Sequence, residues 1–360
     1  MKKSVQFIYL LLLVPFVCFA QKQKNIPHPK NIILLIGDGM GTAQIYAGIT
    51  VSKQTTGQPL NIERSQVIGF HKNQPTDTFI TDSAAGATAF ATGEKTYNGA
   101  IGVDKDKKRL TTILEIAEQK GLATGLVATC NITDATPSSF IAHQPARAMM
   151  DEIAADFLQT DVDVFIGGGR KHFAQRKDSR NLVEDLKAKN YQIANTIEEV
   201  QQVKSGKLAG FLADENPVKI SEGRGDQLLV SLQTTLNILK QNKKGFFMMA
   251  EGSQIDWGGH ANDTQYIVNE MLDFDKAIGA AFDFADKDGN TLVIITADHE
   301  TGGFSLNGAK DGVIDGKFTT KGHTGVMIPV FAYGKGAELF SGIYYNNDIF
   351  HKMLKSFDFK

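Results

Sequence analysis

The sequence predicts an α/β fold with a mostly parallel central sheet and helices on both of its faces. Short apolar runs rich in β-branched residues alternate along the chain with longer stretches whose apolar residues recur at helical spacing. Polar, glycine-containing turns directly follow several of the apolar runs. The chain has 360 residues, 42% of them hydrophobic and 22% charged, so it is large enough to bury a substantial globular core.

Six apolar runs are expected to form the strands of this sheet, because each is short and bounded by polar or glycine residues. They are residues 31–36, 121–129, 162–166, 246–250, 291–296 and 328–333. Four stretches between them have the spacing of amphipathic helices. They are residues 110–119, 146–158, 227–240 and 264–284. The alternation of the two patterns predicts a single α/β domain.

Residues 1–20 have the layout of a secretory signal, with a basic start, an apolar middle and a small residue at the exit. An uncleaved membrane anchor is the alternative, but Pro15 interrupts the apolar run and a polar stretch begins at Gln21. The sequence therefore predicts a signal peptide over 1–20, one domain over 21–360, and a periplasmic or secreted protein that leaves the membrane after cleavage.

The segment over residues 170–222 is more charged and less periodic than the rest of the chain. A small helix is expected at 182–188. The segment could form a lid or a peripheral subdomain. A surface excursion of the main domain is favoured instead, because loops accept extra length at small entropic cost.

Net charge and cysteine content narrow the possible functions. The formal net charge is -2, so composition gives no reason to expect binding to nucleic acid or to anionic membranes. An anionic substrate would need local positive charge, from metal ions or an arginine. Because Cys18 lies in the predicted signal, Cys130 is left without a partner for an internal disulfide.

Three of the expected strands are followed within two residues by a carboxylate, namely Asp38, Glu251 and Asp298. Ligands of an open parallel sheet bind outside the carboxyl ends of its strands, so these side chains are expected at one edge. Converging carboxylates repel one another strongly unless cations lie between them. The pattern therefore predicts a metal site.

Histidines at suitable positions extend this prediction. Asp256 and His260 are four residues apart, so one helical turn or a tight loop would bring both side chains to one side. His299 is adjacent to Asp298, and His323 lies just before the last expected strand. Imidazole with carboxylate suits zinc, whereas carboxylates with a hydroxyl and water suit magnesium. Structural roles are assigned to His28, His71, His143, His172 and His351.

Two further segments allow alternative interpretations. The glycine-rich turn at residues 37–41 could cradle a dinucleotide, but the carboxylate of Asp38 would oppose a pyrophosphate, which favours a tight turn around a metal ligand. The small residues at 81–93 predict a close-packed helix that opens at Asp82 and Ser83. Taken alone, Ser83 is more often a helix cap than a nucleophile activated by the helix N-terminus and a zinc ion.

Seven short blocks, taken in order, resemble the alkaline phosphatase family, in particular its secreted bacterial members. The blocks are GDGMG (37–41), TDSAA (81–85), KTYNG (95–99), TDATP (133–137), EGSQID (251–256), TADH (296–299) and HTG (323–325). Any one could occur by chance, but the ordered set is specific and spans most of the chain. The resemblance implies the alkaline phosphatase fold and a homodimer.

The resemblance also implies three metal ions, two Zn²⁺ and one Mg²⁺. One zinc would be held by Asp256, His260 and His323. The second zinc, beside the nucleophile, would be held by Asp38, Asp298 and His299. The magnesium would be held by Asp38, Thr136 and Glu251.

The same resemblance makes Ser83 the nucleophile and Arg147 the group that grips the phosphoryl oxygens. It implies hydrolysis of phosphate monoesters to alcohol and inorganic phosphate through a phosphoserine. A site that reads only the phosphoryl group predicts broad substrate range, and the need for deprotonated ligands and nucleophile predicts activity rising into alkaline pH.

The chain departs from the best-known bacterial member at Trp257, where that enzyme has a lysine. Some marine and cold-adapted relatives share the tryptophan, but they usually place a histidine where this chain has Asp134. We expect Asp134, just behind the metal ligands, to keep the third site selective for magnesium. Trp257 is expected either to line the mouth of the site or to lie buried in the core.

Two other classes of function are alternatives to this interpretation. A phosphodiesterase, phosphoglycerate mutase or sulfatase of the same superfamily is one, although the residues around Ser83 lack the proline and arginine context of a sulfatase. A phosphate-binding or metal-storage protein without turnover is the other. Hydrolysis of mono- against diesters separates the first class, and a Ser83→Ala variant separates the second.

Overall fold

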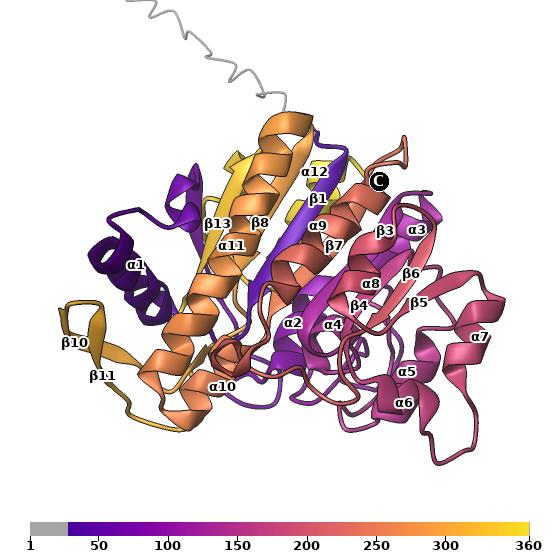
Figure 1. Cartoon of the computed structure of the whole chain (residues 1–360), viewed down its shortest axis with the longest axis horizontal. Coiled ribbons are helices and arrows are strands. Elements are labelled where there is room, and N and C mark those ends of the chain that lie inside the picture. The colour runs from indigo at the N-terminus through magenta and orange to yellow at the C-terminus, as the bar shows by residue number, and fades with distance from the viewer. Residues whose placement is uncertain (1–27, 360) are drawn as a thin grey trace, which may run out of the picture.

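The computed structural model describes residues 28–359 (Figure 1). The predicted signal peptide over residues 1–20 lies outside this range, so export of the protein stays a prediction. Within the described residues, no helix is both long enough and apolar enough to cross a membrane.

A ten-stranded sheet in the order β14-β2-β13-β8-β1-β7-β3-β4-β6-β5 forms the centre of the fold, which confirms the predicted α/β class. All its pairs are parallel except those of β13, which runs antiparallel to β2 and β8. The strands are β1 (Asn31–Gly37), β2 (Val67–Lys72), β3 (Ala123–Asn131), β4 (Val164–Gly168), β5 (Tyr191–Ala194), β6 (Lys207–Phe211), β7 (Phe246–Gly252), β8 (Thr291–Thr296), β13 (Ile328–Gly334) and β14 (Gly342–Tyr345).

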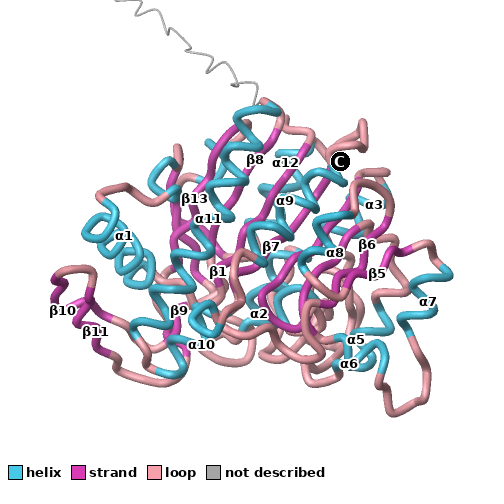
Figure 2. The backbone as a smooth tube through the Cα atoms, viewed as in Figure 1, coloured by secondary structure: helices cyan, strands magenta, loops and turns pink. Residues whose placement is uncertain are grey.

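The sheet is buried on both faces, and helices cover each of them (Figure 2). In β1, Ile32, Leu34 and Ile36 pack into the core on one face, while Ile33 and Leu35 pack into the core on the other. This explains why the inner strands read as continuous apolar runs.

One face is covered by α1 (Thr42–Thr56), η1 (Asn61–Arg64), α8 (Ile197–Gln202), α9 (Gln227–Leu239), α10 (Gln254–Ala261) and α11 (Thr264–Asp288). The opposite face is covered by α2 (Ser83–Thr92), α3 (Ile113–Gln119), α4 (Ala135–Ser138), α5 (Met150–Asp156), α6 (Arg170–Ala174), α7 (Leu182–Ala188), η3 (Ala337–Phe340) and α12 (Asp348–Phe357).

The predicted elements are present, but their boundaries differ where caps decide them. The helix expected from residue 110 begins at Ile113, because the Thr112 side chain accepts from the Glu115 amide and caps it. The helix expected over 146–158 is only α5, so Arg147 lies in the turn before it. The strand expected to be last, β13, is followed by β14.

The segment over 170–222 contributes to the central sheet. Its strands β5 and β6 extend the sheet beyond β4, and α6, α7, α8 and the short helix η2 (Ile220–Glu222) join them. The small helix predicted at 182–188 is confirmed as α7.

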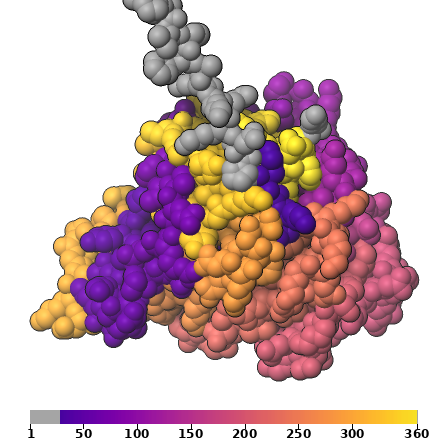
Figure 3. All heavy atoms as spheres, turned by 90° about the horizontal axis from the view of Figure 1, so that it is seen from above, coloured from indigo at the N-terminus to yellow at the C-terminus, as the bar shows by residue number. Residues whose placement is uncertain are grey.

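Two small two-stranded sheets lie outside the central one. The hairpin of β10 (Ser305–Lys310) and β11 (Val313–Lys317) lies beside α1, as Figure 3 shows from above, and Gln54 of α1 accepts from the Gly312 amide. The pair of β9 (Glu300–Thr301) and β12 (His323–Thr324) closes the chain over the carboxyl end of the central strands. This second pair contains His323, and His299 directly precedes its first strand.

Candidate metal centre

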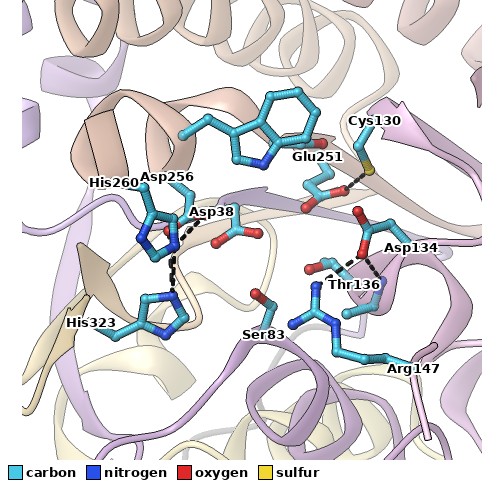
Figure 4. A pocket seen from close by; sticks show the side chains of 13 residues that line it. Asp38, Ser83, Cys130, Asp134, Thr136, Arg147, Glu251, Asp256, His260 and His323 are labelled. Carbon is cyan, nitrogen blue, oxygen red and sulfur yellow. Dashed lines mark hydrogen bonds and ion pairs between the residues drawn. The ribbon is translucent and has the colours of Figure 1, made fainter. Parts of the chain in front are cut away.

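A cavity of ≈ 80 Å³ opens at the carboxyl ends of the central strands (Figure 4). Its position follows from the topology, because β8, β1, β7 and β3 are neighbours and their ends meet there. The cavity is lined by ten of the twelve site residues singled out from the sequence: Asp38, Ser83, Asp134, Thr136, Arg147, Glu251, Asp256, Trp257, His260 and His323. The other two, Asp298 and His299, are fully buried, and His299 contacts both Asp38 and Asp298.

The loop after β1 is held tightly against α10. Gly39 has φ +69, and a Cβ atom there would lie 2.6 Å from the Asp256 Cα. The Gly39 amide also donates to Asp298 Oδ1 at 3.3 Å. Glycine at this turn therefore lets the loop bring Asp38 close to two other carboxylates.

One group of possible cation ligands consists of Asp256, His260 and His323. Helix α10 presents Asp256 and His260 one turn apart, with 3.3 Å between Asp256 Oδ2 and His260 Nε2. His323 Nε2 lies 3.6 Å from Asp256 Oδ1. The Nδ1 atoms of His260 and His323 contact the carbonyl oxygens of Lys321 and Thr81, at 2.5 and 2.9 Å.

These carbonyl contacts fit imidazoles that are protonated on Nδ1, which leaves a lone pair on each Nε2. The two Nε2 atoms of His260 and His323 then face each other at 3.2 Å. Two imidazole nitrogens on one tetrahedral zinc, each about 2.0–2.1 Å from it, would be about 3.3 Å apart. The pair therefore fits a shared cation better than a direct contact.

A second group lies next to the first and contains Asp38, Asp256 and His299. His299 Nε2 is 3.4 Å from Asp38 Oδ1 and 3.3 Å from Asp298 Oδ2. Among the described residues, Asp38 Oδ1 and Asp298 Oδ2 are buried without a hydrogen-bond donor. Buried acceptors that lack donors are costly, and a cation would satisfy them.

The carboxylates of this cluster have strongly shifted acidities. Burial, followed by the charges of Asp298 and Asp256, raises the pKa of Asp38 well above its usual range. Burial and the charge of Asp256 raise the pKa of Asp298 to about 7. Burial and a neighbouring carboxylate raise the pKa of Glu251 to about 8. Crowded negative charge of this kind is relieved by divalent cations, so the residues present fit a multi-metal site.

The pKa values of two residues in the first group, Asp256 and His260, favour the charged forms instead. Although burial opposes it, the hydrogen bond with His260 helps to lower the pKa of Asp256 to about 2. The same hydrogen bond raises the pKa of His260 to about 9. Without a metal ion, this carboxylate and imidazole attract each other as an ion pair.

Ser83 is the first residue of α2, but it does not cap the helix. The Asp82 side chain is the N-cap and accepts from the Ala85 amide at 2.9 Å. The Ser83 hydroxyl is therefore not needed for capping, and its Oγ lies 3.2 Å from His299 Nε2. The capping interpretation of Ser83 is wrong, because its neighbour performs that role.

Arg147 is fixed on the opposite side of the cavity from the histidines (Figure 4). Its Nη1 donates to Asp82 Oδ2 at 3.3 Å and its Nη2 donates to Asp134 Oδ1 at 2.9 Å. Close to it, the buried hydroxyl of Thr136 has no hydrogen-bond partner among the described residues and lines the cavity with Glu251. An arginine held between two carboxylates is oriented toward the cavity rather than free at the surface.

Three residues of the site were not identified from the sequence. Cys130, near the end of β3, places its thiol 3.4 Å from Glu251 Oε2, and Ser253 lines the cavity beside it. The position of Cys130 at the end of a central strand is the signal that could have identified it, since the carboxylates were found in that way. Thr301, two residues after His299, bonds both Asp256 and His299.

The remaining histidines of the described chain that have contacts assigned lie away from the cavity. His71 is fully buried against the Ala297 carbonyl, His143 contacts Glu115, and His172 contacts Asp151. His28 contacts the Ser356 carbonyl, and the His351 ring packs against Phe350. These contacts agree with the structural roles predicted for them. Trp257 lines the cavity and also packs against the core, so it combines the two roles expected for it as alternatives.

Comparison with known proteins identifies close relatives. The alkaline phosphatase family model matches residues 29–315. Alkaline phosphatase 4 of Bacillus subtilis is 36% identical, with 93% of this chain and 91% of the relative covered, and alkaline phosphatase of Escherichia coli is 33% identical over 90% of this chain and 85% of its own. The solved alkaline phosphatase of the Antarctic bacterium TAB5 superposes with a TM-score of 0.87 at 44% identity, covering 93% of this chain and 99% of its own.

The tight turn at Gly39 gives a test of how the site is held together. We expect Gly39→Ala to lower the free energy of unfolding by about 2–5 kcal/mol, because left-handed backbone strain and a clash with Asp256 add up. Gly57→Ala is the matched control, since Gly57 has φ +73 but nothing within 4 Å of its added Cβ. It should cost only about 1–2 kcal/mol. Urea denaturation of both variants measures the difference, and equal losses would show that the approach of the loop to α10 is not a constraint.

Proposed function

The chain belongs to the alkaline phosphatase family and is a phosphatase, and from that premise we propose that it hydrolyses phosphate monoesters through a phosphoserine on Ser83, at a site for two zinc ions and one magnesium ion. The observation that carries the proposal is the position of the Ser83 hydroxyl. Ser83 is the first residue of a helix that Asp82 caps. Its Oγ lies 3.2 Å from His299 Nε2, and the residue lines the same cavity as Arg147.

We assign the cations as the resemblance to the family implies. Asp256, His260 and His323 would hold one zinc. Asp38, Asp298 and His299 would hold the other. Asp38, Thr136 and Glu251 would hold magnesium. When bound, these ions would lower the pKa of the serine hydroxyl and stabilise negative charge on the leaving oxygen.

The chain's own residues then account for the two halves of the reaction. Ser83 Oγ gives up its proton to solvent and attacks phosphorus, so that a bond from Oγ to phosphorus forms and the bond from phosphorus to the ester oxygen breaks. The leaving oxygen takes a proton from water and departs as the alcohol. Water then attacks the phosphoserine, which releases inorganic phosphate and returns the hydroxyl. Two inversions at phosphorus give overall retention. The amides at the start of α2 favour developing negative charge on Ser83.

Arg147 supplies the binding of the phosphoryl group. Its guanidinium can offer two parallel N–H donors to two phosphoryl oxygens, a geometry that lysine lacks. The ion pairs with Asp82 and Asp134 hold it in place before substrate arrives. Because the residues named here all address the phosphoryl group, we propose a broad range of leaving groups and a preference for monoesters over diesters.

The first test removes the proposed nucleophile. Ser83→Ala should lower turnover of p-nitrophenyl phosphate by at least about 10³-fold, because no covalent intermediate can form. It should still bind inorganic phosphate and should show no ³²P-labelled protein. Ser231→Ala is the matched control: Ser231 is buried on α9, and its hydroxyl has no hydrogen-bond partner among the described residues.

Three results would contradict this proposal. A Ser83→Ala variant with control-level turnover would exclude the phosphoserine. If the unchanged protein hydrolysed bis(p-nitrophenyl) phosphate faster than the monoester, it would be a diesterase. A protein that binds phosphate tightly without any turnover would belong instead to the non-catalytic class.

The metal content is the second test. A solved variant of the TAB5 enzyme with aspartate in place of a histidine has magnesium bound in its M3 site, and we take Asp134 as the counterpart of that aspartate. We expect two zinc ions and one magnesium ion per purified chain by elemental analysis. Asp134→His should shift the third site toward zinc, because imidazole suits zinc and oxygen ligands suit magnesium.

Asp185→His, on the exposed face of α7, is the control for that substitution and should leave the metal content unchanged. Three zinc ions and no magnesium in the unchanged protein would refute the role proposed for Asp134.

The homodimer is the third part of the proposal. It is supported by exposed apolar side chains at the β14 edge of the sheet, where Ile68 and Ile343 are 55% and 64% exposed. Because β14 pairs in register with β2, these two side chains lie on one face. Light scattering should give twice the mass of one chain, and Ile343→Lys should shift it toward one. A monomeric unchanged protein would contradict the proposal.

A further inference from the structure

We infer that Thr301 is a positioning residue whose buried hydroxyl links the two proposed zinc sites. Its Oγ1 donates to Asp256 Oδ1 and lies 3.2 Å from His299 Nδ1. Asp256 belongs to one proposed zinc site and His299 to the other, so a single side chain contacts both. The inference rests on the function proposed above.

The direction of the two hydrogen bonds follows from the chemistry of the hydroxyl. Thr301 Oγ1 donates to Asp256 Oδ1, so the single hydroxyl proton is used in that bond. The hydroxyl oxygen is then left as an acceptor for His299 Nδ1–H. The chain of donors runs from His299 through Thr301 to Asp256 without conflict.

This arrangement fixes which nitrogen of His299 is free. With the proton on Nδ1, the lone pair of Nε2 points toward Asp38, Asp298 and the Ser83 hydroxyl. His299 could ligate a cation only in this tautomer. Thr301 therefore holds the ring in the state and the orientation that the site needs.

Thr301 differs from the groups that orient the other two histidines. His260 and His323 are oriented by backbone carbonyl oxygens, of Lys321 and Thr81, which lead to no further ligand. Thr301 instead passes the contact on to Asp256.

The backbone around Thr301 leaves it little freedom to move. The residue is fully buried in β9, its amide donates to Gly39 O at 3.3 Å, and its carbonyl accepts from Gln44 Nε2 at 2.9 Å. A Cβ on Gly259 of α10 would lie 2.7 Å from the Thr301 carbonyl oxygen. The hydroxyl is therefore fixed between the turn after β1 and α10.

The experiment compares three variants of the full chain with the unchanged protein. Thr301→Val keeps the shape of the side chain but removes the hydroxyl, Thr301→Ser keeps the hydroxyl, and Thr296→Val is the matched control. Thr296 is equally buried and bonds only backbone carbonyls. Zinc affinity is measured by competition with a chromogenic zinc chelator, and the zinc retained after purification is counted.

We expect Thr301→Val to weaken zinc binding by about 10–100-fold, the usual effect of losing a group that orients a metal ligand. Both zinc ions should be affected, since the hydroxyl contacts a ligand from each site. Thr301→Ser and Thr296→Val should bind zinc close to the level of the unchanged protein. A role in packing alone would not produce this difference between valine and serine. Thr301→Ala also lacks the hydroxyl and replaces the valine variant should that one not fold.

The outcomes distinguish a failure of the Thr301 link from a failure of the proposed function. If Thr301→Val binds both zinc ions as tightly as the unchanged protein, or if Thr301→Ser is equally weak, the link through the hydroxyl is wrong while the proposed function stands. If the unchanged protein binds no zinc, the proposed function itself fails, and the inference fails with it.

Discussion

The repulsion between carboxylates at one edge of the sheet is the constraint on which the rest of the site depends. Parallel strands β8, β1 and β7 lie side by side, so the acidic residues that end them are brought together whether or not their charges allow it. Burial raises the cost, and the pKa of Asp38 and of Asp298 rises accordingly. The hydrophobic strands are buried on both faces of the sheet, and this burial stabilises the fold enough to hold the unfavourable cluster. A stable scaffold commonly supports a reactive site in this way.

Much of the fold could be predicted because the inner strands carry a strong local signal. Every residue of β1, β7 and β8 is buried, so these strands read as unbroken apolar runs. Strands β2 and β14, at one end of the sheet, mix buried and exposed residues, and the local pattern does not predict them. Helix α1 was missed for a related reason, since its many β-branched and polar residues give no clear apolar stripe. Tertiary packing, rather than local pattern, decides these elements.

The site residues could be named from the sequence where the chemistry is carried by a carboxylate, an imidazole or a nucleophile in a recognisable block. Residues that act through others could not be named in that way. Thr301 has no distinctive type or spacing, and its importance appears only when Asp256 and His299, 43 residues apart in sequence, are seen on either side of it. Cys130 was judged by its lack of a disulfide partner, although its thiol contacts Glu251. Sequence spacing does not report such long-range contacts.

The way in which Asp82 is used shows how one side chain can assemble the reactive part of this site. Its Oδ1 caps α2, which sets the position of Ser83 at the first turn. Its Oδ2 accepts from the Gly99 amide at 3.0 Å and from Arg147 at 3.3 Å. One carboxylate therefore fixes the relative positions of the helix that carries the serine, the loop around Gly99 and the arginine. Because the capping bond and the ion pair use different oxygens, Asp82 can hold Arg147 without giving up the cap. The sequence places Asp82 directly before Ser83, and the structure gives a physical reason for that order. The Asp82 carboxylate bonds Arg147, while Ser83, the next residue, lines the cavity.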